Sequence, residues 1–424
     1  MATMFERTAL PDGPRVISAR LAGARSVSIA AYVLAGSRLE GPGQTGAAHF
    51  MEHLTFKGTA RFPSTRAISE AIEGVGGSFN AATDRESTIY WVRVPARVAE
   101  RGMDVIGELI VRPTLDEREI DNERDVIIEE IRSYLDDPSE YVQILFQQGM
   151  FGTGALGREI CGDEDGIRSL PAAAIHDFWS ATYRPSNTVV AVSGDLDHDH
   201  AVALADLAFG RGNGQVPGFE PAPALPAGDR VLFAKRSTAQ AQVALGVPGL
   251  PRDHPDSWVL AVLNGVLGDG MSSRLFLSVR EEKGLAYDIS SGAIDYADSG
   301  AVAVSAGVDP DRLKPAIGAM LVELSRLRDD PVPADELAKA KAYLSGGLEL
   351  RMEETRHLAS WVGGQEALHD RVLTLEEALD AVAGVESREI QRLAGELFRD
   401  DVLRLAVVAP ARAGRGLEAT LRLP

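Results

Sequence analysis

Two histidines and a glutamate in the segment 49–53, His-Phe-Met-Glu-His, form the most chemically suggestive pattern in the chain. If this segment is helical, His49 and His53 lie on one face, because residues four apart are neighbours on a helix surface. Their imidazoles could then hold one metal ion. Glu52 projects near the same face, where it could act on a water held by that metal. The order H-x-x-E-H reverses the H-E-x-x-H zinc motif. A catalytic zinc has three protein ligands and one open position, so a third ligand must come from elsewhere.

The segment 116–134 is the best source of that third ligand. It contains no Gly or Pro and is rich in Glu and Arg, which predicts a helix. Its apolar residues share one stripe, which consists of Ile120, Ile127, Ile131 and Tyr134. Glu123 and Glu130 fall on the same stripe, where acids are costly unless they are paired or bind a metal. Glu129 points about 100° away from Glu130. We therefore predict Glu130 as the third ligand and Glu123 as an acid that orients a ligand.

These residues resemble the insulinase/pitrilysin family, and most closely its two-domain branch, which includes mitochondrial processing peptidase subunits and bacterial processing-protease homologues. In that family the third zinc ligand is the Glu found 77 residues after the second His, which is Glu130 here. The auxiliary acid of the family lies seven residues earlier, at Glu123. The resemblance thus selects the same two acids as the stripe.

The resemblance extends over nearly the whole chain. The run Tyr183–Asn187, followed by Val192–Leu196, is similar to the segment that closes the family's first domain. Residues 280–287, Arg-Glu-Glu-Lys-Gly-Leu-Ala-Tyr, are close to an element of its second domain. The family resemblance implies that Arg280 and Tyr287 act on the substrate and its oxyanion. The plainer interpretation is that Arg280 is a surface helix residue and Tyr287 a core strand residue. One departure is Ala155, where many relatives carry His-Pro before the Leu-Gly.

A substrate strand is expected around Ser78-Phe79-Asn80-Ala81. An extended peptide can pair with the edge of a sheet through main-chain hydrogen bonds. The resemblance places this strand beside the zinc and implies substrate contacts at Asn80 and Ala81. The plainer interpretation of the preceding Gly76-Gly77 is a flexible entry to a strand.

Composition narrows the function further. The chain has 424 residues, of which 45% are hydrophobic and 25% charged, with a formal net charge of −19. No Lys/Arg-rich block offsets the acid, so no nucleic-acid partner is expected. No apolar run approaches the length of a membrane span and no secretory signal is visible, so we expect no membrane association and a cytoplasmic location. Cys161, the only cysteine, suits a reducing compartment and is expected to be a buried apolar residue.

A length of 424 residues predicts more than one domain. The Gly- and Pro-rich segment 211–228 is typical of a linker, which divides the chain into a zinc-binding catalytic domain, 1–210, and a metal-free homologous domain, 229–424. Both halves show the same order of strands and helices. The motif helix is expected at 45–56 with Thr45 as its N-cap, and a hairpin turn at 82–84. The expected fold class is α+β, with two duplicated α/β sandwich domains, each a mixed and mostly antiparallel sheet packed with helices.

The residues and the resemblance together predict a zinc endopeptidase with one Zn²⁺ per chain. It would cleave extended or unfolded peptides inside a chamber formed by two chains, either a homodimer or a heterodimer with a paralogue. A non-catalytic or regulatory subunit of a processing peptidase is the alternative, although retention of Glu52 and all three ligands argues against it. A structural zinc would usually have four protein ligands and little need for Glu52.

Overall fold

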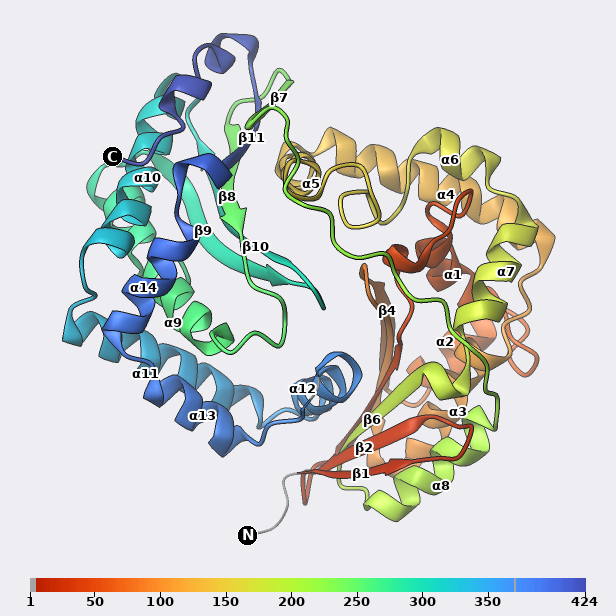
Figure 1. The fold of residues 1–424 in the computed structure, drawn as a ribbon. Helices are drawn as coiled ribbons and strands as arrows, with labels where there is room; N and C mark the ends of the chain where they lie inside the picture. The colour runs from red at the N-terminus through yellow and green to blue at the C-terminus, as the bar shows by residue number, and fades with distance from the viewer. Residues whose placement is uncertain (1–4, 370) are drawn as a thin grey trace. The chain divides into compact units, whose positions relative to one another are not determined.

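The computed structural model describes residues 5–369 and 371–424 and divides the chain into two compact units. The first unit comprises the chain up to Ile131 together with Glu159–Glu220 and Glu349–Leu375. The second comprises Arg132–Arg158, Pro221–Leu348 and Glu376–Pro424. Each unit is a mixed sheet packed with helices, as the fold class predicted, and the helices lie on both faces (Figure 1).

The sheet of the first unit has the order β1-β2-β6-β3-β5-β4. Its strands are β1 (Glu6–Ala9), β2 (Arg15–Arg20), β3 (Ser26–Val33), β4 (Ser78–Thr83), β5 (Thr88–Pro95) and β6 (Thr188–Gly194). Strands β3 and β6 are almost wholly buried and rich in Val, Ile and Ala, as expected of central strands covered on both faces. Strand β4 is the opposite case, because it ends the sheet and is exposed at alternate positions.

Helices of the first unit surround this sheet. Helices α3 (Ala99–Val111) and α8 (His198–Phe209) pack together on one face. The first unit also contains α1 (Ala47–Thr55), α2 (Thr65–Glu73), α6 (Glu164–Ser169) and α7 (Ala172–Thr182), together with a helix from the second half of the chain that is described below. Helix α4 (Glu117–Asp136) begins in the first unit and ends in the second.

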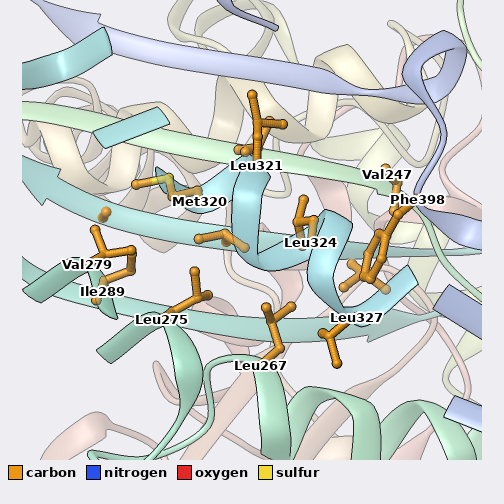
Figure 2. Close-up of a cluster of buried hydrophobic side chains, with 14 of the residues drawn as sticks. Val247, Leu267, Leu275, Val279, Ile289, Met320, Leu321, Leu324, Leu327 and Phe398 are labelled. Atoms are coloured by element: carbon orange, nitrogen blue, oxygen red, sulfur yellow. The ribbon is translucent and has the colours of Figure 1, made fainter. Parts of the chain in front are cut away.

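The sheet of the second unit has the order β7-β11-β8-β10-β9. Its strands are β7 (Val231–Lys235), β8 (Ala241–Pro248), β9 (Ala286–Asp295), β10 (Gly300–Val308) and β11 (Arg404–Ala409). Helices α9 (Ser257–Leu267), α10 (Leu313–Asp329) and α14 (Ser387–Leu397) build the main core with this sheet. Figure 2 shows Met320, Leu321, Leu324 and Leu327 of α10 within that core. Helix α11 (Ala334–Arg351) begins in the second unit and ends in the first, and α13 (Leu375–Gly384) lies in the second unit apart from its first residue.

The two sheets repeat one topology. In each, one pair of strands is parallel, β2 with β6 and β7 with β11, and the other pairs are antiparallel. The parallel pair is followed in space by a strand and a hairpin in the same order, β3-β5-β4 and β8-β10-β9. The duplication expected from the order of elements is therefore present in the strand pairing.

Each unit also receives one helix from the other half of the chain. Helix α5 (Pro138–Phe151) packs on β8 and β11, and its Phe146 lies in a cluster with Ala244 and Ala406. Helix α12 (Thr355–Leu368), blue in Figure 1, packs on β2, β3 and β6. The expected halves 1–210 and 229–424 are thus each joined by a helical segment of the other, and the segment 211–228 between them contains no helix or strand.

A glycine allows α12 to approach the first sheet closely. A Cβ atom at Gly363 would lie 2.5 Å from Cβ of Ala191 and 2.7 Å from Cε2 of Tyr32. Hydrogen bonds fasten both ends of the helix: Thr355 shares one with Ser28 at 2.9 Å, and Arg15 donates to the carbonyl of Glu366 at 2.8 Å. The helix is therefore an integral layer of the first unit.

Several local expectations need correction. The motif helix begins at Ala47 and its N-cap is Gly46 rather than Thr45. The turn between β4 and β5 lies at 84–87 rather than 82–84, because β4 stays paired through Thr83. Residues Phe276–Glu282 form a π-helical segment, which the sequence pattern did not distinguish. No helix in the described part of the chain has the length and apolar character that crossing a membrane requires.

Candidate metal centre

Helix α1, which carries both histidines, starts at a tight turn. Gly46 has φ of 87°, and a Cβ there would lie 2.5 Å from Cδ1 of Ile167, so this position requires glycine. The backbone N–H of Ala48 donates to the Glu40 carboxylate at 3.0 Å, which satisfies one free N–H of the first turn. The rings of His49 and His53 lie 4.5 Å apart on the face that follows.

Glu130 reaches these histidines from α4. Its Oε2 lies 3.2 Å from Nε2 of His49 and 3.4 Å from Nε2 of His53. All three ligand atoms lie within 4.8 Å of one another. Among residues 5–369 and 371–424, no other cluster of His, Cys, Asp or Glu side chains could hold a metal ion in this way. The structure therefore brings together the three residues that the sequence proposed as ligands.

The donor set fits zinc. Zinc binds imidazole nitrogen and carboxylate oxygen at about 2.0–2.2 Å, so two ligand atoms around a tetrahedral ion lie ~3.3–3.5 Å apart. The distances from Glu130 to the two imidazoles, 3.2 and 3.4 Å, are close to that spacing. Three converging donors also leave a fourth position, which distinguishes a catalytic from a structural arrangement.

Glu123 lies behind the histidines and holds one of them. Its Oε1 accepts a hydrogen bond from Nδ1 of His53 at 2.8 Å, which leaves Nε2 of that ring for a metal. The side chain of Glu123 is only 5% exposed, and its other oxygen contacts Nζ of Lys57. Sequence reasoning predicted Glu123 but missed Lys57, which follows the motif helix by two residues and carried no signal of its own.

Opposing effects set the pKa values of this pair. Burial disfavours the charged form of His53, but hydrogen bonds and charge from Glu123 and Glu130 outweigh it and raise the pKa of His53 to about 9. Burial likewise disfavours the charged form of Glu123. The hydrogen bonds from His53 and Lys57 outweigh that effect and hold the pKa of Glu123 below its usual value. Without a metal, the pair is therefore an imidazolium with a carboxylate.

Glu52 lies between the histidines and the edge strand. Its Oε2 is 3.9 Å from Nδ1 of His49 and accepts a hydrogen bond from the Thr83 hydroxyl at 2.5 Å. Thr83, the last residue of β4, was not among the predicted site residues. Alternation along the strand could have found it, because Phe79, Ala81 and Thr83 share one face.

Asn80 and Ala81 lie on β4, the strand that ends the first sheet. The side chain of Asn80 is exposed, and its Oδ1 accepts a hydrogen bond from the backbone N–H of Ala81 at 2.9 Å. These two residues thus lie three and two positions before the residue that contacts Glu52.

Arg280 and Tyr287 belong to the second unit, whereas the histidines and Glu130 belong to the first. Arg280 lies in the π-helical segment, with its guanidinium carbon 4.6 Å from the centre of the Phe276 ring. Tyr287 lies near the start of β9 and is 73% exposed. The plainer interpretation of Tyr287 as a core residue is therefore wrong.

Cys161 lies near the same centre but is a buried residue, as expected. Burial raises the pKa of its thiol well above the usual value, and the nearby carboxylates of Glu130 and Glu159 add to this effect. A thiol in such surroundings is a poor source of thiolate.

Comparison with known proteins accounts for both halves of the chain. Residues 15–164 match the family described as insulinase (peptidase family M16), and residues 169–344 match the domain described as peptidase M16 inactive domain. All three predicted ligands and Glu52 fall in the first match.

The curated relatives cover the chain almost from end to end. A zinc protease from Streptomyces coelicolor is 36% identical over 92% of this chain and 87% of its own length. One from Mycobacterium leprae is 34% identical (98% of this chain, 94% of its own), and one from Bacillus subtilis is 33% identical (96% and 99%). All three are named as uncharacterized zinc proteases.

Solved structures share the fold. A peptidase M16 inactive domain from Pseudomonas fluorescens superposes with a TM-score of 0.89 at 18% identity, covering 96% of this chain and 98% of that one. A protease from Helicobacter pylori gives 0.88 at 23% identity, covering 96% and 99%. The motif, the sheet duplication and these matches lead to one conclusion: the chain belongs to the insulinase family, peptidase family M16.

Proposed function

We propose that this protein is a zinc-dependent endopeptidase that cleaves extended or unfolded peptides. The observation that carries the proposal is the convergence of His49, His53 and Glu130 at distances that suit one zinc ion, with the Glu52 carboxylate beside them. The names of the relatives support zinc and proteolysis as the class of chemistry.

The three side chains would hold one zinc per chain, with Glu123 fixing His53 from behind. When bound, zinc supplies Lewis acidity, which lowers the pKa of a coordinated water and polarises the carbonyl of the scissile bond. Glu52 would act as the general base that takes the proton from the attacking water and then delivers it to the leaving amine. Because Glu52 lies on α1, one residue before His53, the helix keeps its carboxylate next to the metal ligands during the reaction.

The edge of β4 is the proposed site of substrate capture. An edge strand presents unpaired N–H and C=O groups, with which an extended peptide can form main-chain hydrogen bonds. Asn80 and Ala81 would contact the peptide there, after the Asn80 side chain releases the N–H of Ala81 that it now occupies. Because strand addition needs a free main chain, we expect flexible peptides and tails as substrates rather than folded proteins.

Arg280 and Tyr287 are proposed to stabilise the oxyanion and hold substrate. The described part of one chain provides one set of metal ligands, and the chain has one Arg280–Tyr287 element. Following the family resemblance, we propose a chamber formed by two chains, in which this element of one chain serves the zinc of the other. A homodimer is the simplest form, and a heterodimer with a paralogue is the other.

The test is incubation of the purified, zinc-loaded chain with a mixed peptide library, with products identified by mass spectrometry. The matched control is Glu52→Gln, which should retain zinc and peptide affinity but lose turnover by about 10² or more for a missing general base. Cleavage by the wild type and not by the variant supports the proposal. Peptide binding without cleavage by either protein would instead indicate a non-catalytic subunit.

A further inference from the structure

One contact of Glu52 has no role in the scheme above. Its Oε2 accepts a hydrogen bond of 2.5 Å from the hydroxyl of Thr83. Within residues 5–369 and 371–424, no other group donates a hydrogen bond to this carboxylate. The second oxygen, Oε1, accepts no hydrogen bond from the described residues.

We propose that Thr83 is a positioning residue for the general base, an inference that rests on the proposed function of Glu52. A Glu side chain has three rotatable bonds, so a carboxylate at the end of it does not keep one orientation unaided. Catalysis by a general base depends on holding that group within hydrogen-bond reach of the proton it takes. The Thr83 hydroxyl restricts the carboxylate to one orientation by holding one of its two oxygens.

The backbone around Thr83 is well suited to this task. Thr83 pairs with Thr88 across the hairpin, and the Thr88 hydroxyl is buried and donates to the carbonyl of Ala35 at 2.8 Å. Alternation along β4 places Phe79 on the same face as Thr83, and the Phe79 ring lies 5.6 Å from that of Phe56, just after α1. The strand is thus fixed against the region of α1, and a β-branched residue such as Thr has few χ1 choices left.

The same strand would receive the substrate. A peptide paired with the open edge of β4 and the base held by the last residue of β4 would share one rigid element. Thr83 then affects the rate of the chemical step rather than peptide affinity or metal binding. A merely structural Thr would instead affect stability, with no separate influence on turnover.

The experiment compares Thr83→Val, which keeps the shape and strand preference but removes the donor, with Thr83→Ser, which keeps the donor. In T83V we expect kcat to fall by ~10- to 100-fold, which is no more than the fall expected when Glu52→Gln removes the general base. KM, zinc content and thermal midpoint should stay near wild-type values. T83S should recover most of the rate, and T83V should cause no further loss in a Glu52→Gln background, because the group it positions is already absent.

Crystal structures of zinc-loaded wild type and T83V supply a readout that does not depend on turnover. We expect one Glu52 orientation in the wild type and several, or a displaced one, in T83V. An unchanged Glu52 orientation in T83V, wild-type kcat in T83V, or equal loss in T83S and T83V would overturn the inference. If the wild type cleaves no peptide but Glu52 still moves in T83V, the proposed function fails while the positioning role stands.

Discussion

Oε1 of Glu123 accepts the hydrogen bond from Nδ1 of His53 at 2.8 Å, while Nε2 of the same ring lies 3.4 Å from Oε2 of Glu130. One imidazole is thus held between two carboxylates that play different parts. The acid behind the ring sets its orientation and tautomer, and the acid in front shares the proposed metal.

Removal of one ligand should abolish zinc binding. With His53→Ala, two ligands remain, which cannot offset the dehydration of the ion. Zinc content measured by plasma mass spectrometry after dialysis should fall from about one per chain to near zero. His254→Ala, a histidine of the second unit, is the matched control and should keep its zinc. Equal zinc content in wild type and His53→Ala would refute the assignment.

The pair behind His53 should tune metal affinity without supplying a ligand. Glu123→Gln should weaken zinc affinity by ~10- to 100-fold, because the ring loses its charged acceptor. Lys57→Met removes the contact with the other oxygen of Glu123 and should weaken affinity by a smaller factor. Competition with a zinc chelator measures both. If both variants bind zinc as tightly as the wild type, the two residues do not support the centre.

Zinc uptake should release a proton near neutral pH. In the folded, metal-free protein the pKa of His53 is raised from 6.5 to about 9. The protonated ring therefore stabilises the metal-free fold fully below about pH 6.5, and this stabilisation is lost as the pH rises through about 9. Zinc needs Nε2 without its proton, so apparent affinity should rise across the same window. Calorimetry at pH 7.5 in two buffers of different ionisation enthalpy should report about one proton released per zinc. A binding heat independent of buffer would argue against a protonated His53.

Helix α12 should be required for the stability of the unit that holds the metal ligands, although it lies in the second half of the chain. Gly363→Ala forces a Cβ to within 2.5 Å of Ala191, and such overpacking costs about 1–3 kcal/mol in free energy of unfolding. Gly364→Ala is the matched control, because its Cβ would lie 3.5 Å from the Tyr32 hydroxyl, an ordinary contact. Denaturant titration should show a loss for the first variant and none for the second. Similar stability of both would mean that α12 adapts its distance from the sheet.

Two inactive variants should complement each other if two chains form the chamber. Arg280→Ala and Glu52→Gln are each expected to lose activity, and mixed dimers would carry one intact metal centre facing one intact Arg280–Tyr287 element. Peptide cleavage should therefore reappear after subunit exchange. Exchange shown by fluorescence transfer without recovery of cleavage would indicate that each chain completes its own site.

The sequence alone was sufficient to predict the residues that converge. His49, Glu52 and His53 are predicted by local spacing, since four residues make about one helical turn. Glu123 and Glu130 are predicted because acids on an apolar stripe need a partner. In the structure, Glu123 contacts the imidazole of His53, and Glu130 contacts the imidazoles of both histidines. The duplicated order of strands and helices could also be predicted, because hydrophobic periodicity is a local property of the chain.

Tertiary structure decided what local periodicity does not encode. An apolar stripe shows that a helix is covered but not which sheet covers it, so the exchange of α5 and α12 between the units was invisible in the sequence. The contact of Lys57 with Glu123 and the hydrogen bond of Thr83 to Glu52 join residues 66 and 31 positions apart. Such pairs of polar side chains are set by the packing of a strand and two helices, because only the folded backbone brings their atoms within hydrogen-bond reach.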